Sequence, residues 1–249
     1  MGSAFRNPSF GSPSGTLPFG VKWLLISNIA IFLLQFILYQ GAGIQLSFLK
    51  LVPAQTVSGY IWQPFTYMFL HGGVFHILFN MLALWMFGVE LERMWGSRYF
   101  TKFYFVAGGG AALTTLLLSF APFPFADRLY NSLTIGASGA VYGVLLAYAL
   151  YFPNRPIYMY FFFPIPAKYF VMIMGAISLY SSMGATGGGV AHTTHLGGLV
   201  AAYLYLKGGR TNLLAEIRYR LARWRINKSR RRFDVYSGGR SHDTNRRVH

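Results

Sequence analysis

Three apolar stretches of the sequence carry polar side chains of the kinds that perform nucleophilic catalysis. In the first, Ser138 lies between Gly136 and Gly139 at the start of the stretch 133–151. A serine in a helix commonly bonds back to a carbonyl one turn earlier, but two flanking glycines leave open space beside this hydroxyl. That space could admit a neighbouring helix, as small residues do in membrane bundles, or it could admit the backbone of a substrate.

A histidine and an asparagine form the second group of polar residues. His76 and Asn80 are spaced i,i+4, so they share one face of a helix. Two readings of this pair remain open. The side chains could fix the packing of the bundle by hydrogen bonds, or they could donate hydrogen bonds to a developing negative charge, as the donors of an oxyanion hole do.

The third group is a histidine followed by two glycines. Gly197 and Gly198 allow the helix that carries His195 to pack closely against a neighbour. A hydroxyl, a base and a pair of donors are the groups that nucleophilic catalysis requires. Because no acidic residue lies in these stretches to orient the base, a Ser138–His195 dyad is the form available, and Tyr142 could support the imidazole by stacking on it.

A metal site is the alternative use of these histidines. His192 lies one turn before His195, so the two side chains could share a metal ion. The apolar stretches contain no carboxylate except those of Glu90 and Glu92, which lie at the end of one stretch. A divalent cation bound only by neutral ligands in a low-dielectric interior would be poorly stabilised. We therefore expect no metal and no cofactor. The sequence assigns no role to His192 or to His71.

The composition is that of a polytopic membrane protein. Of the 249 residues, 54% are hydrophobic and 11% are charged, less than half the charged share of a soluble domain. The absence of cysteine excludes disulfides and thiol catalysis. We expect an all-α fold, a bundle of six transmembrane helices, with spans at residues 22–39, 65–87, 103–120, 133–151, 167–183 and 190–206.

The distribution of Lys and Arg predicts how this bundle is oriented. Lys50 and Arg128 are the only Lys and Arg residues between the predicted spans on one side, and the others lie on the side that carries both termini. The positive-inside rule therefore places both termini in the cytoplasm. Residues 1–20 show neither a signal peptide nor an Arg/Ser-rich transit peptide, which favours the inner membrane of a bacterium.

The composition and the distribution of charge divide the chain into three regions. We expect a flexible cytoplasmic segment 1–20, a membrane domain 21–207 and a basic cytoplasmic tail 208–249. Twelve of the 22 Lys and Arg residues lie beyond Gly208, so the net charge of +16 belongs mainly to the tail. We expect this tail to contact anionic lipids and not nucleic acid. Its first part is a possible amphipathic helix with an apolar stripe formed by Leu214, Ile217, Leu221 and Trp224, followed by a disordered end.

The combination of these motifs resembles the rhomboid family of intramembrane serine proteases. The resemblance covers roughly residues 20–207. The matching motifs, in chain order, are His76-x-x-x-Asn80, Glu90-Leu-Glu92-x-x-x-Gly96, Gly136-x-Ser138-Gly139 and His195-x-Gly197-Gly198. Many rhomboids also carry Trp-Arg in the first outer loop, where this chain has Trp62-Gln63.

The resemblance implies a six-helix bundle whose active site opens to the outer face. Ser138 would be the nucleophile, His195 the base, and Tyr142 the residue that stacks on the base. The oxyanion hole would be formed by His76, Asn80 and the backbone N–H of Ser138. Gly136, Gly139 and Gly198 would support these groups.

The activity expected from the resemblance is cleavage of transmembrane segments of single-pass membrane proteins through an acyl-enzyme. The substrate would dock beside the second and fifth helices, where Phe79 is a candidate gate. A catalytically silent relative that binds membrane proteins is the alternative, but loss of the serine or histidine is expected there and both are present. A transporter would predict intramembrane charges or repeated halves, which this sequence lacks.

Overall fold

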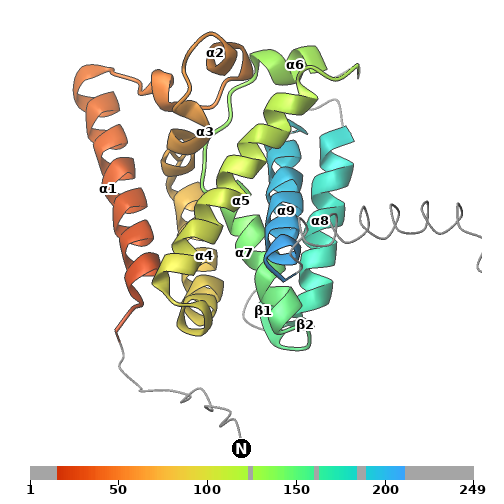
Figure 1. Cartoon of the computed structure of the whole chain (residues 1–249). Helices are drawn as coiled ribbons and strands as arrows, with labels where there is room; N and C mark the ends of the chain where they lie inside the picture. The colour runs from red at the N-terminus through yellow and green to blue at the C-terminus, as the bar shows by residue number, and fades with distance from the viewer. Residues whose placement is uncertain (1–15, 123–125, 160–162, 184–188, 211–249) are drawn as a thin grey trace, which may run out of the picture. The chain divides into compact units, whose positions relative to one another are not determined.

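The structure of the chain, a computed structural model, is mostly helical (Figure 1). It describes residues 16–122, 126–159, 163–183 and 189–210. The long helices among these residues are α1 (Phe19–Ala42), α4 (Val74–Trp95), α5 (Ser97–Leu118), α7 (Ser138–Tyr151), α8 (Ala167–Met183) and α9 (Gly189–Arg210). The described residues up to Leu206 form one compact unit, and the second unit, Lys207–His249, is described only over its first four residues.

Short elements connect these helices at the two ends of the bundle (Figure 1). One end carries η1 (Ser47–Leu49), α2 (Pro53–Val57) and α6 (Ala126–Asn131), and α3 (Gln63–Thr66) and η2 (Tyr67–Phe69) lead from this end to α4. The other end carries the antiparallel strands β1 (Pro156–Met159) and β2 (Phe163–Pro166), with Ile157 opposite Ile165. Residues 1–15 and the amphipathic stretch predicted in the tail lie outside the described residues.

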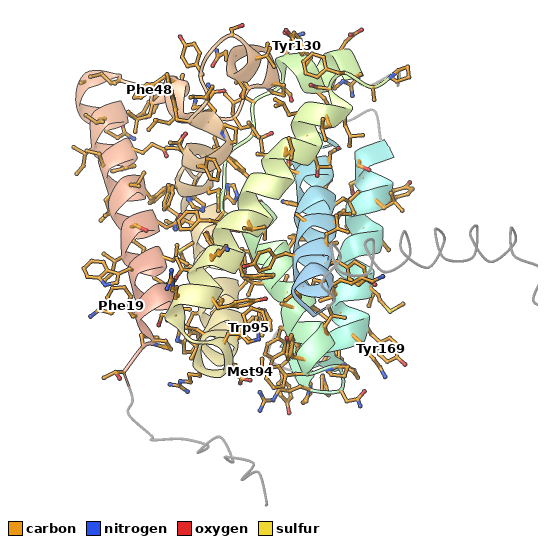
Figure 2. The ribbon with its side chains drawn as sticks, in the orientation of Figure 1. Phe19, Phe48, Met94, Trp95, Tyr130 and Tyr169 are labelled. Carbon is orange, nitrogen blue, oxygen red and sulfur yellow. The ribbon has the colours of Figure 1, made fainter. Side chains whose placement is uncertain are left out.

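Three of the long helices, α1, α4 and α5, are long and apolar enough to cross a membrane, and α7 is a shorter apolar helix. Aromatic side chains lie at both ends of the bundle, with Phe48 and Tyr130 at one end and Trp95 and Tyr169 at the other (Figure 2). Trp and Tyr gather in this way at the two interfaces of a bilayer. Both observations fit a protein that is embedded in lipid.

The second predicted helix starts later than the sequence indicates. The apolar stretch 65–87 was expected to be one helix, but the chain forms α3 and η2, becomes extended at Leu70, and starts α4 at Val74. The glycine pair 72–73 explains the break, because glycine disfavours a helix interior by about 1 kcal/mol. This break creates the turn that places His71 beside the start of α4.

The fourth predicted helix also starts later, at Ser138 and not at residue 133. Thr134 pairs with Leu51 in an isolated antiparallel bridge, and Gly136 has a φ of +120°, which a helix does not allow. As a result α7 has 14 residues, a length of about 21 Å against the ~30 Å of a bilayer core. Ser138 is therefore the first residue of its helix.

Helix α7 is the centre of the bundle, and ten of its 14 residues are buried. It packs against α4, α5 and α8. Its contact with α9 is made backbone to backbone, because a Cβ atom added to Gly198 would overlap the carbonyl oxygen of Gly139. This close approach brings α7 and α9 to the distance at which side chains on their facing surfaces can hydrogen-bond.

A buried carboxylate joins α1 to the end of α4. Glu92 is 2% exposed and accepts hydrogen bonds from the backbone N–H groups of Gly20 and Val21, each at 2.6 Å. These two N–H groups belong to the first turn of α1 and have no partner within the helix. A carboxylate in this position also interacts favourably with the helix dipole. Glu92 therefore fixes the start of α1 against the bundle.

We expect Glu92→Gln to lower the free energy of unfolding by about 1–3 kcal/mol, because an amide NH₂ would face one of these N–H donors and leave it unsatisfied. The measurement is the thermal unfolding midpoint in detergent. Glu90→Gln is the matched control, since Glu90 pairs with Arg155 at the surface, where ion pairs contribute little. Equal midpoints for the two variants would contradict the role assigned to Glu92.

A buried amide anchors the first part of the loop between α1 and α4. Gln63 is fully buried and accepts hydrogen bonds from the Val52 N–H at 3.1 Å and the Thr56 hydroxyl at 3.0 Å. It donates to Gln55 Oε1 at 2.9 Å and to the Phe48 carbonyl at 3.4 Å. Every hydrogen-bonding position of the amide is thus engaged. Glutamine at this position provides an anchor for the loop without a charge.

Candidate active site

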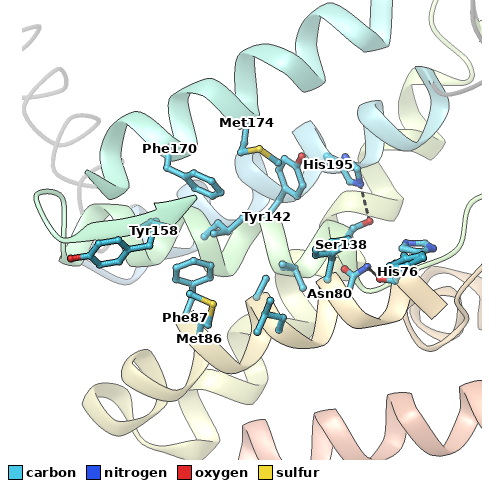
Figure 3. Close-up of a pocket in the computed structure, with 17 residues that line it drawn as sticks. His76, Asn80, Met86, Phe87, Ser138, Tyr142, Tyr158, Phe170, Met174 and His195 are labelled. Atoms are coloured by element: carbon cyan, nitrogen blue, oxygen red, sulfur yellow. Dashed lines mark hydrogen bonds between the residues drawn. The ribbon is translucent and has the colours of Figure 1, made fainter. Parts of the chain in front are cut away.

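The two helices that meet at Gly198 bring Ser138 and His195 together. The distance from Ser138 Oγ to His195 Nε2 is 2.8 Å (Figure 3). A hydroxyl that donates to Nε2 requires the neutral imidazole to carry its proton on Nδ1. In this arrangement the ring can remove the proton of the serine as its oxygen attacks an electrophile.

The ring of Tyr142 lies flat against His195. Tyr142 is one turn after Ser138 on α7, and the ring centroids are 4.3 Å apart with an interplanar angle of 10°. Its hydroxyl accepts a hydrogen bond from Ser178 Oγ on α8 at 3.2 Å. The imidazole is therefore held between its serine partner and a ring that is itself fixed from a third helix.

His76 and Asn80 lie on the face of α4 that is directed toward Ser138 (Figure 3). His76 Nδ1 accepts a hydrogen bond from the Gly72 N–H at 3.3 Å, so the neutral ring carries its proton on Nε2. Asn80 Nδ2 donates to the His76 carbonyl at 2.8 Å, which leaves its second amide hydrogen free of that bond. Both side chains line the same cavity as Ser138.

The glycines beside Ser138 make room for different neighbours. A Cβ atom on Gly136 would lie 2.6 Å from His76 Nε2, and the positive φ at this position also favours glycine. A Cβ atom on Gly139 would lie 2.8 Å from Ala111 Cβ and 3.0 Å from the Tyr67 hydroxyl. Gly136 thus admits the histidine, whereas Gly139 serves helix packing.

Tyr67 is a supporting residue that the sequence did not indicate. It is fully buried; its carbonyl accepts a hydrogen bond from the Gly136 N–H at 2.9 Å, and its hydroxyl donates to the Gly108 carbonyl at 2.9 Å. It fixes the backbone that leads into Ser138. Nothing in the local sequence distinguishes this tyrosine from the many other aromatic residues of the chain.

A cavity of about 590 Å³ extends from Ser138 and His195 between α4, α7 and α8 to strand β1. Its walls are apolar away from the polar end, with Met86, Phe87, Tyr158, Phe170 and Met174 among the lining residues (Figure 3). Phe79 lies on the wall and is 63% exposed. The cavity offers an apolar surface continuous with the hydroxyl–imidazole pair.

The two remaining histidines of the region pack against the rings already described. His192 is edge-on to His195 at 5.5 Å, and His71 is edge-on to His76 at 5.1 Å and fully buried. The described residues contain no group of three or more His, Cys, Asp or Glu that could hold a metal ion. In the sequence of α7, α8 and α9 there is no acidic residue, so the site contains no carboxylate from these helices.

Residues 58–210, more than half of the chain, match the family model of the rhomboid domain. The chain therefore belongs to the rhomboid family. Its membership and its apolar helices make it an integral membrane protein.

Three relatives are rhomboid proteins from a fungus and two bacteria. The chain is 32% identical over 140 residues to Rhomboid protein 1, mitochondrial, of Saccharomyces cerevisiae, covering 55% of this chain and 38% of the relative. It is 39% identical over 88 residues to Rhomboid protease GluP of Bacillus subtilis, covering 35% and 15%. It is 29% identical over 137 residues to Rhomboid protease AarA of Providencia stuartii, covering 51% and 49%. The matched segments thus span less than half of each relative.

Proposed function

We propose that the protein is an intramembrane serine endopeptidase that cleaves the transmembrane segments of single-pass membrane proteins. The observation that carries this proposal is the 2.8 Å contact between Ser138 Oγ and His195 Nε2 at the polar end of an apolar cavity. Two of the relatives are named proteases, which supports the same reaction class.

In the proposed reaction, His195 Nε2 takes the hydroxyl proton as Ser138 Oγ attacks the carbonyl carbon of the scissile peptide. The tetrahedral intermediate collapses when His195 gives this proton to the leaving amine, and an acyl-enzyme remains. Water, deprotonated by His195, then attacks the ester and releases the acid and the free serine. Tyr142 keeps the imidazole oriented through both half-reactions.

The negative charge of each tetrahedral intermediate would be stabilised by three donors: His76 Nε2–H, the second amide hydrogen of Asn80 and the Ser138 backbone N–H. The first two line the cavity with Ser138. The third belongs to the first residue of α7, whose N–H has no partner within its own helix. Loss of one such donor typically costs about 2.7–4 kcal/mol of transition-state stabilisation.

The substrate would enter between α4 and α8, past Phe79 as a gate, and lie along the apolar cavity. A helical segment hides its carbonyls in i→i−4 hydrogen bonds, so the part that reaches Ser138 must unwind first. Unwound backbone inside a membrane is tolerated where protein or a polar cavity satisfies it. Small or helix-breaking residues near the cleaved bond would favour this step.

We further propose that all six long helices lie across the membrane with both termini in the cytoplasm, in the inner membrane of a bacterium. The positive-inside rule supports this orientation, because Arg93, Arg98, Arg155 and Lys168 all flank the cytoplasmic ends of the proposed spans. The basic tail beyond residue 207 would then contact the anionic lipids of the inner leaflet.

The test of the proposed activity is reconstitution of the purified protein in liposomes with a single-pass substrate. We expect cleavage within the transmembrane segment, mapped by mass spectrometry of both fragments. A fluorophosphonate probe should form an adduct on Ser138 alone. An intact substrate together with an unlabelled Ser138 would overturn the proposal and favour a catalytically silent binding protein.

The contact between Tyr142 and His195 gives a separate prediction. Tyr142→Leu removes the stacked ring, so we expect the cleavage rate to fall about two- to tenfold, the range of a single aromatic contact. Tyr142→Phe keeps the ring and loses only the bond from Ser178, so its rate should stay close to that of the wild type. Initial rates in detergent provide the measurement. Equal losses in the two variants would show that the hydroxyl, and not the stacking, is what matters.

A further inference from the structure

A glutamine of α1 holds the backbone just before α4 with both ends of its amide. Gln35 Nε2 donates to the carbonyl of His71 at 2.9 Å, and Gln35 Oε1 accepts from the His71 N–H at 3.3 Å. The two residues are 36 positions apart, and Gln35 is half-buried. Helix α1 contributes no residue to the lining of the cavity, so this amide is a direct connection from α1 to the segment that leads into the site.

The peptide group that Gln35 holds is also bonded at its other end. The carbonyl of His71 and the N–H of Gly72 belong to one peptide unit, and this N–H donates to His76 Nδ1 at 3.3 Å. A hydrogen bond to the carbonyl of a peptide strengthens its N–H as a donor. The three groups therefore form a continuous series of hydrogen bonds from Gln35, through one peptide group, to the imidazole of His76.

The last of these hydrogen bonds, from the Gly72 N–H to His76 Nδ1, decides which nitrogen of His76 can donate. A neutral imidazole has one donor nitrogen and one acceptor nitrogen. With Nδ1 accepting from Gly72, the proton lies on Nε2, the nitrogen that faces Gly136 next to Ser138. Only this tautomer, in this ring orientation, presents a hydrogen to an oxyanion formed at Ser138.

The segment between His71 and α4 needs such support. Gly72 and Gly73 follow one another without side chains, and consecutive glycines have wide conformational freedom. The ring of His71 is fully buried and packs edge-on against His76, which fixes the side chain of His71. The amide of Gln35 fixes the backbone of the same residue.

We propose that Gln35 is a positioning residue for the oxyanion hole, acting through the His71–Gly72 peptide on the tautomer and orientation of His76. This inference rests on the proposed function. The competing explanation is that Gln35 only packs α1 against the bundle. That role would change the stability of the protein, but it would not change the transition state selectively, and it would not depend on His76.

The first test compares two variants of Gln35. Gln35→Leu removes both hydrogen bonds at similar volume, and Gln35→Glu keeps the acceptor but sets a carboxylate oxygen against the His71 carbonyl. For each we expect kcat to fall about three- to tenfold, the range of one or two net hydrogen bonds, with KM within about twofold, since oxyanion stabilisation is realised only in the transition state. Leu34→Ala, a substitution at an exposed neighbour on α1, is the matched control and should leave both constants unchanged.

The second test asks whether the effect passes through His76. In the His76→Ala background, Gln35→Leu should cause no further loss of kcat. Losses that multiply in the double variant would overturn the inference, as would an unchanged kcat in both single variants.

A third measurement is independent of proteolysis. In histidine labelled with ¹⁵N, the His76 resonances, assigned by their loss in His76→Ala, should report the Nε2–H tautomer in the wild type. We expect a mixture of tautomers in Gln35→Leu. If no substrate is cleaved but this shift occurs, the proposed function fails, and only the control of the His76 tautomer by Gln35 stands. If cleavage occurs while kcat and tautomer are the same in wild type and Gln35→Leu, the positioning role fails alone.

Discussion

Replacing either Ser138 or His195 with alanine is expected to reduce cleavage of a transmembrane substrate by about 10⁴-fold or more, as removal of a nucleophile or its base does in soluble serine proteases. Without Ser138 no acyl-enzyme can form, and without His195 the hydroxyl at 2.8 Å from its ring has no group to take its proton. Because the two residues act as one unit, the double variant should be no slower than either single variant.

The measurement is the initial rate of cleavage by purified variants of equal thermal stability. Ser182→Ala is a matched control, because the Ser182 hydroxyl is exposed on α8 and bonds to the carbonyl of Leu179 within its own helix. Its rate should equal that of the wild type. Residual cleavage above about 1% in Ser138→Ala, far more than removal of a nucleophile leaves, would mean that another residue is the nucleophile.

Gly198→Ala is expected to prevent α7 and α9 from packing at their native distance. The added Cβ atom would overlap the carbonyl oxygen of Gly139, and a backbone atom cannot move away as a flexible side chain can. Overpacking of a tight core costs about 1–3 kcal/mol and sometimes more, and we expect the upper end here. The separation of α7 from α9 should also abolish labelling of Ser138 by a fluorophosphonate, because His195 moves with α9.

Thermal unfolding and probe labelling of the same preparation test this expectation. Gly41→Ala is the control, because a Cβ atom on Gly41, in the last turn of α1, meets nothing within 4 Å. Alanine is the better helix former, so this variant should be at least as stable as the wild type. A Gly198→Ala protein with the wild-type midpoint and full labelling would contradict the backbone contact.

The apolar runs of the sequence were enough to predict the long helices, because each run must be buried in protein or lipid. It was not enough to predict where α4 and α7 begin. Residues 133–137 belong to the same apolar stretch as those that follow, and what prevents a helix there is the pairing of Thr134 with Leu51, together with the positive φ of Gly136. That pairing joins residues more than 80 positions apart, so no local pattern reveals it.

The residue types of the site could be read from the sequence because serine, histidine and asparagine are conspicuous in apolar stretches. Gln35 could not be singled out in the same way, and Gln63 stood out only as a departure from the Trp-Arg of many rhomboids, without a role. Each is a neutral polar residue near the end of a span, where polar residues are common. Their hydrogen-bond partners come together only in the folded chain. Gln35 binds the backbone of His71, and Gln63 binds backbone and side-chain groups of the loop that precedes it.

The absence of acidic residues from α7, α8 and α9 bears on how the proposed protease would be inserted into a membrane. A helix enters the bilayer during synthesis before its neighbours are in place, and an aspartate at its centre adds about 2.5–3.5 kcal/mol to the free energy of insertion. A catalytic triad would impose that penalty on one of these helices. The proposed dyad of a hydroxyl and an imidazole would avoid this penalty, and the charge of the reaction would first develop after α7 and α9 have packed together.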